Sequence, residues 1–501
     1  MRRLFAATLL ALALPVAAHA QALRQPAPDA FAEKARLFVL TDMGNEPDDQ
    51  MSMVRLLLYA NEIDIEGLAA TTSIFLRDKT NPETIRTLIR AYGEARPNLV
   101  KHARGWPEAR ALDALVSSGP PRADMAGIDQ SAPSTAALAL IRAVDRSDAR
   151  PLWVSVWGGA NVLAEALQIV GRARDAAATD AFVARLRVYT ISDQDDAGHW
   201  IRREFPKLAY VVSPSMGGDG FERATWTGIS GDVMYRNDEW SADPTKVSQD
   251  WLDANIRKGP LGTHYPKVAY IMEGDTPSWL GLIANGLNGA MSPGWGSWGG
   301  RYVYRKPYGE PRPIWSQGGP PVFGVNSRDE VTGLDGHKAL SDQATIWRWR
   351  DAYQNDFAAR IDWSMKPLAE ANHRPLAVVN KLTGLAPLTI EARPGEAITL
   401  DASASSDPDK GQTLRYRWFV YREAGAGSGQ SATVELAGAD TATAIATVSE
   451  TCVPPMPWIK MPCGPRMAHV ILQVTDSGTP QLTSYRRVIV TVSKPVASPA
   501  P

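Results

Sequence analysis

Short apolar runs alternate with amphipathic, helix-like segments from about residue 35 to residue 290, and this alternation constrains the fold more than any other feature. Such short, bounded runs are typical of buried parallel strands. Strands that alternate with helices indicate an α/β domain with a mainly parallel sheet. The expected strands are Leu37–Leu40, Ile65–Thr71, Leu152–Trp157, Leu186–Ile191, Leu208–Ser213 and Val268–Met272, and the expected helices include Pro82–Tyr92, Ser134–Val144 and Asn161–Val170.

A strongly acidic loop follows the first expected strand. Four carboxylates fall within eight residues: Asp42, Glu46, Asp48 and Asp49. A helix is expected to begin at Asp48, and acidic residues at a helix start are favoured by the helix dipole, so capping and a solvated loop are one interpretation. The other interpretation is a hard-cation site of the calcium or magnesium type, built from oxygen ligands.

Polar segments follow three further expected strands. Because ligands bind beyond the carboxyl ends of the strands in open α/β sheets, we expect these segments to converge on one rim of the sheet. Acidic residues at three strand ends favour a site for a cation or for sugar hydroxyls. The segments are Trp157-Gly158-Gly159, then Asp193, Asp195 and Asp196, and finally Glu273-Gly274-Asp275.

The stretch from residue 291 to residue 316 is rich in aromatic residues, glycine and proline, and we expect neither helix nor regular strand there. Aromatic rings on such loops can form walls on which sugars stack, because a ring offers a flat apolar face. The alternative is an irregular loop whose aromatic rings pack against its own domain. The rings are Trp295, Trp298, Tyr302, Tyr304, Tyr308 and Trp315.

The two ends of the chain indicate export. Residues 1–20 combine two arginines, an apolar stretch and an Ala-His-Ala cleavage site, which predicts a signal peptide and a periplasmic or extracellular protein. The only two cysteines, Cys452 and Cys463, are expected to form a disulfide in that environment. No later stretch has the length of apolar sequence that a membrane span requires. The balanced charge, 53 basic against 54 acidic residues, argues against a nucleic-acid partner.

The pattern changes near residue 371, after an expected helix over Ser341–Arg360. About seven short β-type runs follow in roughly 120 residues, which is typical of a β-sandwich. We therefore expect an α/β domain over residues 35–365 and a sandwich over residues 374–495. The runs are Leu388–Glu391, Ile398–Leu400, Leu414–Tyr421, Thr433–Leu436, Ala444–Val448, Val470–Val474 and Val488–Val492.

Several motifs resemble known families. VLTDMGNEPDDQ, EIDIEGLAATTS, PLWVSVWGGANVLAEAL and AYIMEGDTPSWL resemble the nucleoside hydrolase fold over roughly residues 35–290. The second domain, with DASASSDPDKGQTLRYRWFVY, resembles immunoglobulin-like modules of the polycystic-kidney-disease-repeat type. Together they resemble secreted proteins that pair a nucleoside-hydrolase-like domain with a β-sandwich and are often labelled cellulose-binding.

The resemblance to nucleoside hydrolases implies one Ca²⁺ and assigns roles to individual residues. Asp42 would ligate the metal and act as general base, and Asp48 would hold sugar hydroxyls. The remaining implied ligands are Asp49, the main-chain carbonyl of Trp157 and Asp275, with Asn161 on the substrate side.

The region that should recognise the leaving group departs from the family pattern. Many nucleoside hydrolases have a histidine just before the last aspartate, and this chain has Gly274 there, beside Glu273. The candidates for the general acid are therefore Glu273, His199 and Asp195. Substrate contacts are also expected from Asp195, Asp196 and Trp200, and from Trp295 and Trp298 in the aromatic stretch.

The expected function is that of an exported Ca²⁺-dependent hydrolase of a glycosidic bond. Its substrate would be an N-riboside or, with the altered leaving-group region, another furanoside or glycan-derived glycoside. One alternative is a protein that binds a cellulose-like polysaccharide without cleaving it, and another is a structural protein that keeps Ca²⁺ for stability. The oligomeric state is left open, with a homo-oligomer among the alternatives.

Overall fold

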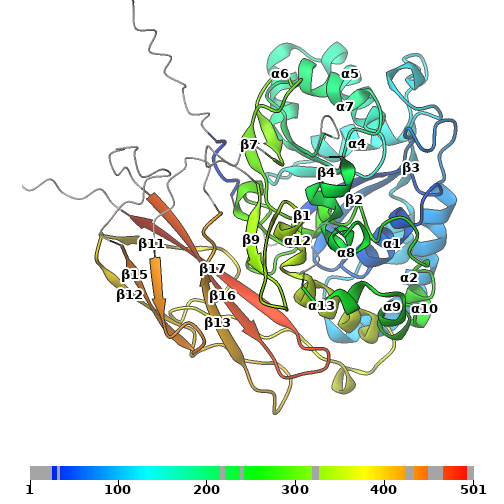
Figure 1. Cartoon of the computed structure of the whole chain (residues 1–501). Helices are drawn as coiled ribbons and strands as arrows, with labels where there is room; N and C mark the ends of the chain where they lie inside the picture. Colours follow the sequence, from blue (N-terminus) through cyan, green and yellow to red (C-terminus); the bar gives the residue numbers. More distant parts are fainter. Residues whose placement is uncertain are drawn as a thin grey trace, which may run out of the picture.

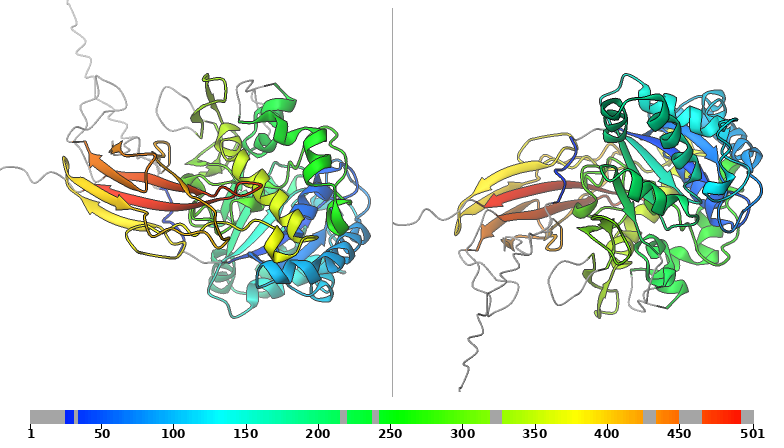
Figure 2. Two further views of the ribbon diagram at one scale, coloured as in Figure 1. Left: turned by 90° about the horizontal axis from the view of Figure 1, so that it is seen from below. Right: turned by 90° about the horizontal axis from the view of Figure 1, so that it is seen from above.

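The fold is taken from a computed structural model of the whole chain, which describes residues 25–30, 34–214, 220–236, 242–318, 327–424, 434–449 and 466–492. An α/β domain is followed by a β-sandwich that packs against one of its sides (Figure 1). The two further views show the sandwich extending away from the α/β domain (Figure 2). The predicted fold class, α/β followed by all-β, is confirmed.

The α/β domain is built on an eight-stranded sheet in the order β3-β2-β1-β4-β5-β6-β8-β7. All neighbouring pairs are parallel except β7 with β8. Five of the six expected strands are present. The strands are β1 (Ala35–Thr41), β2 (Ile63–Ala70), β3 (Val116–Ser118), β4 (Leu152–Val156), β5 (Leu186–Thr190), β6 (Ala209–Val212), β7 (Val303–Arg305) and β8 (Ile314–Ser316).

Both faces of this sheet are covered by helices. Leu37 and Val39 of β1 face one core, with α1, α2 and α13, while Phe38 and Leu40 face the other, with α4, α5 and α7. Burial on both faces explains why β1 reads as a continuous apolar run. The longer helices are α1 (Asp48–Leu57), α2 (Pro82–His102), α4 (Thr135–Asp145), α5 (Asn161–Ala173), α6 (Ala176–Ala184), α7 (Ala197–Glu204), α9 (Gln249–Asn255) and α13 (Arg350–Trp363). The shorter ones are α3 (Ala109–Asp113), α8 (Gly231–Met234), α10 (Gly259–Gly262), α11 (Pro277–Leu280) and α12 (Ala344–Trp347).

The prediction of a strand over Val268–Met272 is wrong. Only an isolated bridge between Ala269 and Ile271 forms there, and Tyr270 and Glu273 have φ angles of 64° and 54°. Positive φ angles are incompatible with an extended strand, so the segment turns instead of joining the sheet. The place next to β6 is taken by β8, from the aromatic stretch in which no strand was expected.

The sandwich consists of a four-stranded sheet, β11-β17-β16-β13, and a three-stranded sheet, β12-β15-β14. All seven expected runs are strands, with bounds shifted by a few residues. They are β11 (Leu388–Ala392), β12 (Ala397–Asp401), β13 (Arg415–Val420), β14 (Val434–Ala437), β15 (Thr443–Val448), β16 (Arg466–Thr475) and β17 (Thr483–Val492), preceded by the hairpin β9 (Asp329–Thr332) and β10 (Lys338–Ser341). Cys452, Cys463 and residues 1–20 lie outside the described residues, so their pairing and the signal peptide remain predictions.

The aromatic stretch packs against the sandwich. The ring of Trp298 is fully buried against Tyr353 and Tyr485, at centroid distances of 6.4 Å. The ring of Trp295 is buried against His469 of β16. The expectation that these two tryptophans stack on a sugar is therefore wrong, because neither ring has a free face. They stabilise the contact between the domains.

A buried arginine stabilises the contact between the two domains. Arg487 of β17 donates hydrogen bonds to the carbonyl oxygens of Leu287, Trp295 and Gly296 in the α/β domain, at 2.7–3.0 Å. Burial lowers the pKa of Arg487 to about 9. The same burial, with Arg487 beside it, holds the pKa of His469 well below its usual value.

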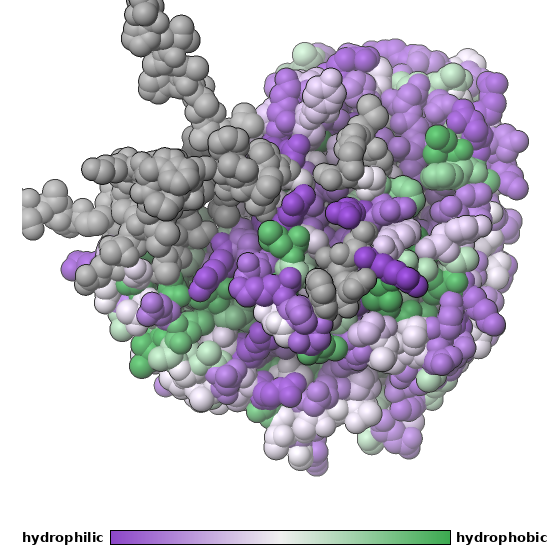
Figure 3. Space-filling model, in the orientation of Figure 1, coloured by the Kyte–Doolittle hydropathy of each residue, from purple (hydrophilic) through white to green (hydrophobic). Residues whose placement is uncertain are grey.

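The described residues on the face drawn in Figure 3 are mostly hydrophilic. On the face drawn in Figure 3, hydrophobic residues form small patches between hydrophilic ones. Among the described residues, no helix combines the length and the apolar character that crossing a membrane would require.

Candidate metal and catalytic site

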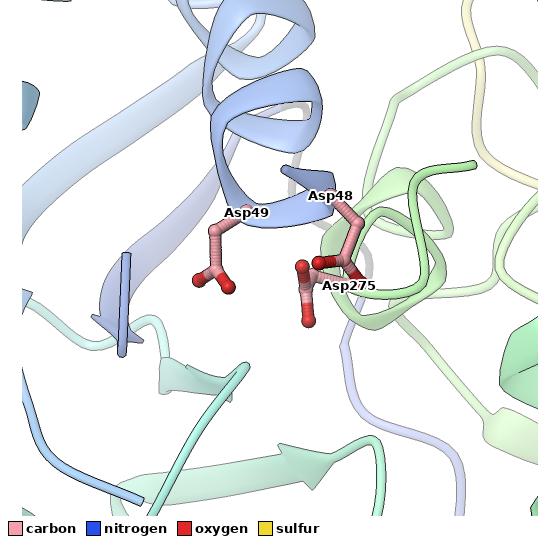
Figure 4. A group of neighbouring side chains, drawn as sticks. All are labelled: Asp48, Asp49 and Asp275. Carbon is pink, nitrogen blue, oxygen red and sulfur yellow. The ribbon is translucent and has the colours of Figure 1, made fainter. Parts of the chain in front are cut away.

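Three aspartates point toward one another at the carboxyl end of β1. Asp48 and Asp49 occupy the first turn of α1, and Asp275 comes from the loop before α11 (Figure 4). Each offers a carboxylate oxygen within 4.8 Å of the others, and all three side chains are buried. Asp42, directly after β1, is also buried. It lies beside the three aspartates, because its side chain is within hydrogen-bonding distance of Asp49.

Helix capping alone does not account for this cluster. The N-cap position of α1 is Pro47, which makes no side-chain capping bond. Asp49 accepts a hydrogen bond from the hydroxyl of Thr41 at the end of β1. Of the two interpretations of the acidic loop, the geometry supports a cation site.

No lysine, arginine or histidine forms an ion pair with any of these four carboxylates within the described part of the chain. Burial raises the pKa of all four, and their mutual repulsion raises it further for Asp48, Asp49 and Asp275. The pKa of Asp48 reaches about 7. Buried carboxylates are normally paired or bound to a metal, so this group calls for a positive charge.

Asp275 gives the clearest sign of a missing partner. Its Oδ2 is buried and has no hydrogen-bond partner among the described residues. A buried carboxylate oxygen without a donor costs free energy, whereas a hard cation is stabilised by such an oxygen. The side chains present therefore fit a cation of the calcium or magnesium type.

Hydrogen bonds between neighbouring elements hold the predicted ligands in place. The indole of Trp157 donates to Ser155 Oγ at 2.8 Å, and the hydroxyls of Ser155 and Ser278 are 2.5 Å apart. Ser278 donates in turn to the carbonyl oxygen of Asp275 at 2.6 Å. The carbonyl of Trp157 accepts one hydrogen bond, at 2.7 Å from Gln194, and its second lone pair remains available for a metal.

Glu273 does not take part in this cluster. It forms a two-pronged ion pair with Arg55 of α1, at 2.6 and 2.9 Å, and both side chains are fully buried. Tyr265 and Thr276 also donate to its carboxylate, each at 2.8 Å. The expectation that Glu273 is the general acid is therefore wrong. It ties α1, which carries Asp48 and Asp49, to the loop that carries Asp275.

His199 and Trp200 also lie apart from the carboxylates. His199 is exposed on α7, and the ring of Trp200 packs on Phe205 and on the core behind the sheet. No described contact links either residue to the cluster. The expected roles of His199 in catalysis and of Trp200 in substrate binding are not supported.

The other predicted substrate residues have structural partners. The side-chain amide of Asn161 is fully buried between Thr71, Thr72 and the carbonyl of Arg122. Asp195 accepts hydrogen bonds at 3.0 Å from the backbone N–H groups of Asn161 and Ala197. Asp196 accepts one from the backbone N–H of Met125. These residues shape the loops at the rim, and both amide hydrogens of Asn161 are already donated to Thr72 and to the carbonyl of Arg122.

Gly158 allows the chain to approach Asp42. A Cβ at this position would lie 2.7 Å from Cβ and Cγ of Asp42. We expect Gly158→Ala to displace Asp42 and to lower Ca²⁺ affinity at least tenfold in calorimetry. Gly171→Ala in helix α5 is the control, because its Cβ would meet no atom within 4 Å and should stabilise the helix by about 0.5–1 kcal/mol. Equal Ca²⁺ affinity in both variants would contradict the placement of Asp42.

Sequence reasoning missed two contributors to the site. Ser73, after β2, donates a hydrogen bond to Oδ2 of Asp42. Trp226 packs beside Gly274, where an added Cβ would lie 2.9 Å from both the Trp226 ring and the carboxylate of Asp48. The indole of Trp226 thus borders the position at which many nucleoside hydrolases carry a histidine. Ser73 ends the motif EIDIEGLAATTS, in which it was given no role, and it lies in the loop after β2. Trp226 lies outside the quoted motifs, in the short 3-10 helix Thr225–Ile229.

Comparison with known families identifies the chain. Residues 36–302, more than half of the sequence, match the model of the nucleoside hydrolase-like domain of cellulose-binding Sde182. The chain belongs to the Sde182 family. Residues 397–492 match the C-terminal domain of the cellulose-binding protein Sde0182, so both domains of the chain correspond to Sde182-type domains.

A solved structure of the same type is similar over nearly the whole chain. It is a nucleoside hydrolase-related hypothetical protein from Saccharophagus degradans, described as associated with carbohydrate metabolism. It is 32% identical, with a TM-score of 0.74, and the match covers 92% of this chain and 100% of that protein. A PKD domain from the KIAA 1837 protein matches 23% of this Sde182-family chain at 24% identity, with a TM-score of 0.14. No curated protein matches the chain.

Proposed function

We propose that this protein is an exported, Ca²⁺-dependent hydrolase of a glycosidic bond. The observation that carries the proposal is the buried, unpartnered Oδ2 of Asp275 in a cluster of carboxylates without a basic partner among the described residues. The nucleoside hydrolase-like fold supports a hydrolytic reaction. Export rests on the signal peptide predicted for residues 1–20.

Asp49, Asp275, Asp42 and the carbonyl of Trp157 are the proposed Ca²⁺ ligands, and the grouping of Asp48 with Asp49 and Asp275 adds a further candidate. A bound Ca²⁺ supplies Lewis acidity for water activation and orients vicinal sugar hydroxyls. Four carboxylates and a carbonyl match the oxygen-rich coordination that Ca²⁺ prefers.

Asp42 is the proposed general base. The hydrogen bond from Ser73 fixes its Oδ2 and so orients the carboxylate. Asp42 takes a proton from a water that attacks the anomeric carbon, and direct attack by water inverts the configuration at that carbon. Asp48, at the start of α1, is proposed to accept hydrogen bonds from sugar hydroxyls.

The substrate is proposed to be a furanoside or a glycan-derived glycoside. Gly274 and the ring of Trp226 occupy the region in which many nucleoside hydrolases hold the leaving base. The cellulose-binding names of the matching families favour a carbohydrate over a free nucleoside.

Turnover by an Asp42→Asn variant tests the proposal. The amide cannot accept the proton, so we expect hydrolysis to fall by about 100-fold or more, with unchanged circular dichroism. Inosine, an aryl arabinofuranoside and cellohexaose are the assayed compounds. Asp180→Asn, an exposed change on α6, is the control. Wild-type turnover by Asp42→Asn would contradict the assignment of the base.

A second candidate function is carbohydrate binding without cleavage. It is favoured by the absence of Glu273 and His199 from the carboxylate cluster, since these were two of the three candidates for the acid. This alternative predicts retention on insoluble cellulose with no release of sugar from any of the three compounds. Release of reducing sugar that requires Asp42 would exclude it.

A further inference from the structure

The turn Ser73–Leu76, between β2 and α2, presents two large apolar side chains to solvent. Ile74 is 54% exposed and Phe75 is 55% exposed, whereas Ser73 and Leu76 on either side are buried. Exposed single apolar residues are common on proteins and need no explanation by themselves. This pair differs from such residues because hydrogen bonds connect its turn to Asp42, one of the four carboxylates.

The hydroxyl of Ser73 connects the turn directly to the proposed base. It donates to Oδ2 of Asp42 and accepts hydrogen bonds from the backbone N–H groups of Phe75 and Leu76, at 3.0 and 3.1 Å. Backbone hydrogen bonds between Ser73 and Leu76 run in both directions, at 3.0 and 3.2 Å. The position of Phe75 is therefore fixed relative to Asp42 through one shared hydroxyl.

The other side of the turn is tied to the proposed carbonyl ligand. The backbone N–H of Ile74 donates to the carbonyl oxygen of Gln194 at 2.7 Å. The side chain of Gln194 donates in turn to the carbonyl oxygen of Trp157 at 2.7 Å. The backbone of the turn is thus linked by hydrogen bonds both to the proposed base and, through Gln194, to a predicted metal ligand.

A second apolar group, from residues 221–235, borders the carboxylate cluster. Trp226 packs beside Gly274 and Asp48, and Tyr235 belongs to the same small apolar cluster. Phe221, which is exposed, meets the Tyr235 ring edge-on at 5.8 Å. Apolar side chains are therefore found beside the carboxylates at two places, at Trp226 and on the turn that is hydrogen-bonded to Asp42. A sugar ring matches this arrangement, because its hydroxyls suit carboxylates while its C–H faces pack on apolar and aromatic side chains.

We infer that the Ser73–Leu76 turn is a carbohydrate-stacking platform, on which Phe75 and Ile74 contact the apolar face of a glycan ring whose hydroxyls reach the carboxylate cluster. The inference rests on the proposed function, which it extends by naming the residues that select a glycan. A free nucleobase on the same platform is the competing occupant, and the test distinguishes the two.

Calorimetric titration with cellohexaose and with inosine, at saturating Ca²⁺, tests the inference. Phe75→Ala is expected to weaken cellohexaose binding at least tenfold, and Ile74→Ala severalfold, with Ca²⁺ affinity unchanged. Leu382→Ala removes an equally exposed leucine, also 55% exposed, near the sandwich and should bind cellohexaose like the wild type. The absence of cellohexaose binding by the wild type, equal binding by Phe75→Ala, or a Phe75→Ala effect confined to inosine would overturn it.

Failure of the platform and failure of the proposed hydrolase give different results. If Asp42→Asn binds cellohexaose normally and the wild type releases no sugar, the platform stands and the hydrolase assignment fails. If the wild type hydrolyses a glycoside and Phe75→Ala does so with unchanged KM, the hydrolase stands and the platform fails.

Discussion

Asp275→Asn is expected to abolish stabilisation of the protein by Ca²⁺. The wild type, freed of metal, should gain about 2.7 kcal/mol when Ca²⁺ reaches 100 times its Kd. The variant loses a charged ligand and should show no gain at the same concentration. Without Ca²⁺, the variant should be more stable than the wild type. Removing one of several neighbouring carboxylates relieves the repulsion that raises their pKa values. Urea unfolding with and without Ca²⁺ measures both effects.

Asp180→Asn is the matched control, since it removes one carboxylate from the exposed surface of α6. It should respond to Ca²⁺ like the wild type.

The Ca²⁺ affinity of the wild type should also depend on pH. Protons compete with Ca²⁺ for carboxylates whose pKa is raised, and that of Asp48 is about 7, so apparent Ca²⁺ affinity should rise from pH 5 to pH 8. A Ca²⁺ response in Asp275→Asn equal to that of the wild type would contradict the ligand assignment.

Glu273→Gln is expected to destabilise the protein by about 3–5 kcal/mol, because it leaves the fully buried guanidinium of Arg55 without its carboxylate. The loss should appear in urea unfolding, and Ca²⁺ affinity should fall as well, since this ion pair joins α1 to the loop of Asp275. Were Glu273 the general acid, the same variant would lose turnover at unchanged stability.

The double variant Arg55→Met/Glu273→Met separates charge pairing from the loss of either side chain. Replacing a buried ion pair by apolar residues of similar size is often neutral or stabilising, so the double variant should recover most of the stability that Glu273→Gln loses. Stability of the double variant as low as that of Glu273→Gln would show that the pair does more than neutralise charge, and would contradict this account.

The sheet and most of its strands could be predicted because buried parallel strands leave a strong local signal, as Leu37–Leu40 does. Val268–Met272 carries a similar apolar signal but turns, with positive φ angles at Tyr270 and Glu273, and the apolar run itself contains no glycine or proline that would signal the turn. The strands β7, at the edge, and β8, beside it, were missed because each has only three residues among glycines and prolines.

Asp42 directly follows β1, and Asp48 and Asp49 begin α1, so the sequence could predict that these carboxylates lie at one edge of the sheet. Asp275 was expected after a strand that does not form. The residues that would contact the leaving group could not be predicted. Glu273 follows an apolar run as a catalytic acid could, yet its role is set by Arg55, which lies 218 positions away in sequence. Trp295 and Trp298 have the composition of a sugar-binding wall, and only the packing of the second domain shows that their rings are covered.

Calorimetric titration of Ca²⁺ into the metal-free wild type and into Asp49→Asn, at pH 7.5, shows whether the carboxylate cluster binds Ca²⁺. We expect one Ca²⁺ per wild-type chain and at least a 100-fold weaker Kd for the variant, because Asp49 is a buried carboxylate of the three-aspartate cluster. No binding by the wild type up to millimolar Ca²⁺, or the same Kd for both proteins, would contradict this expectation.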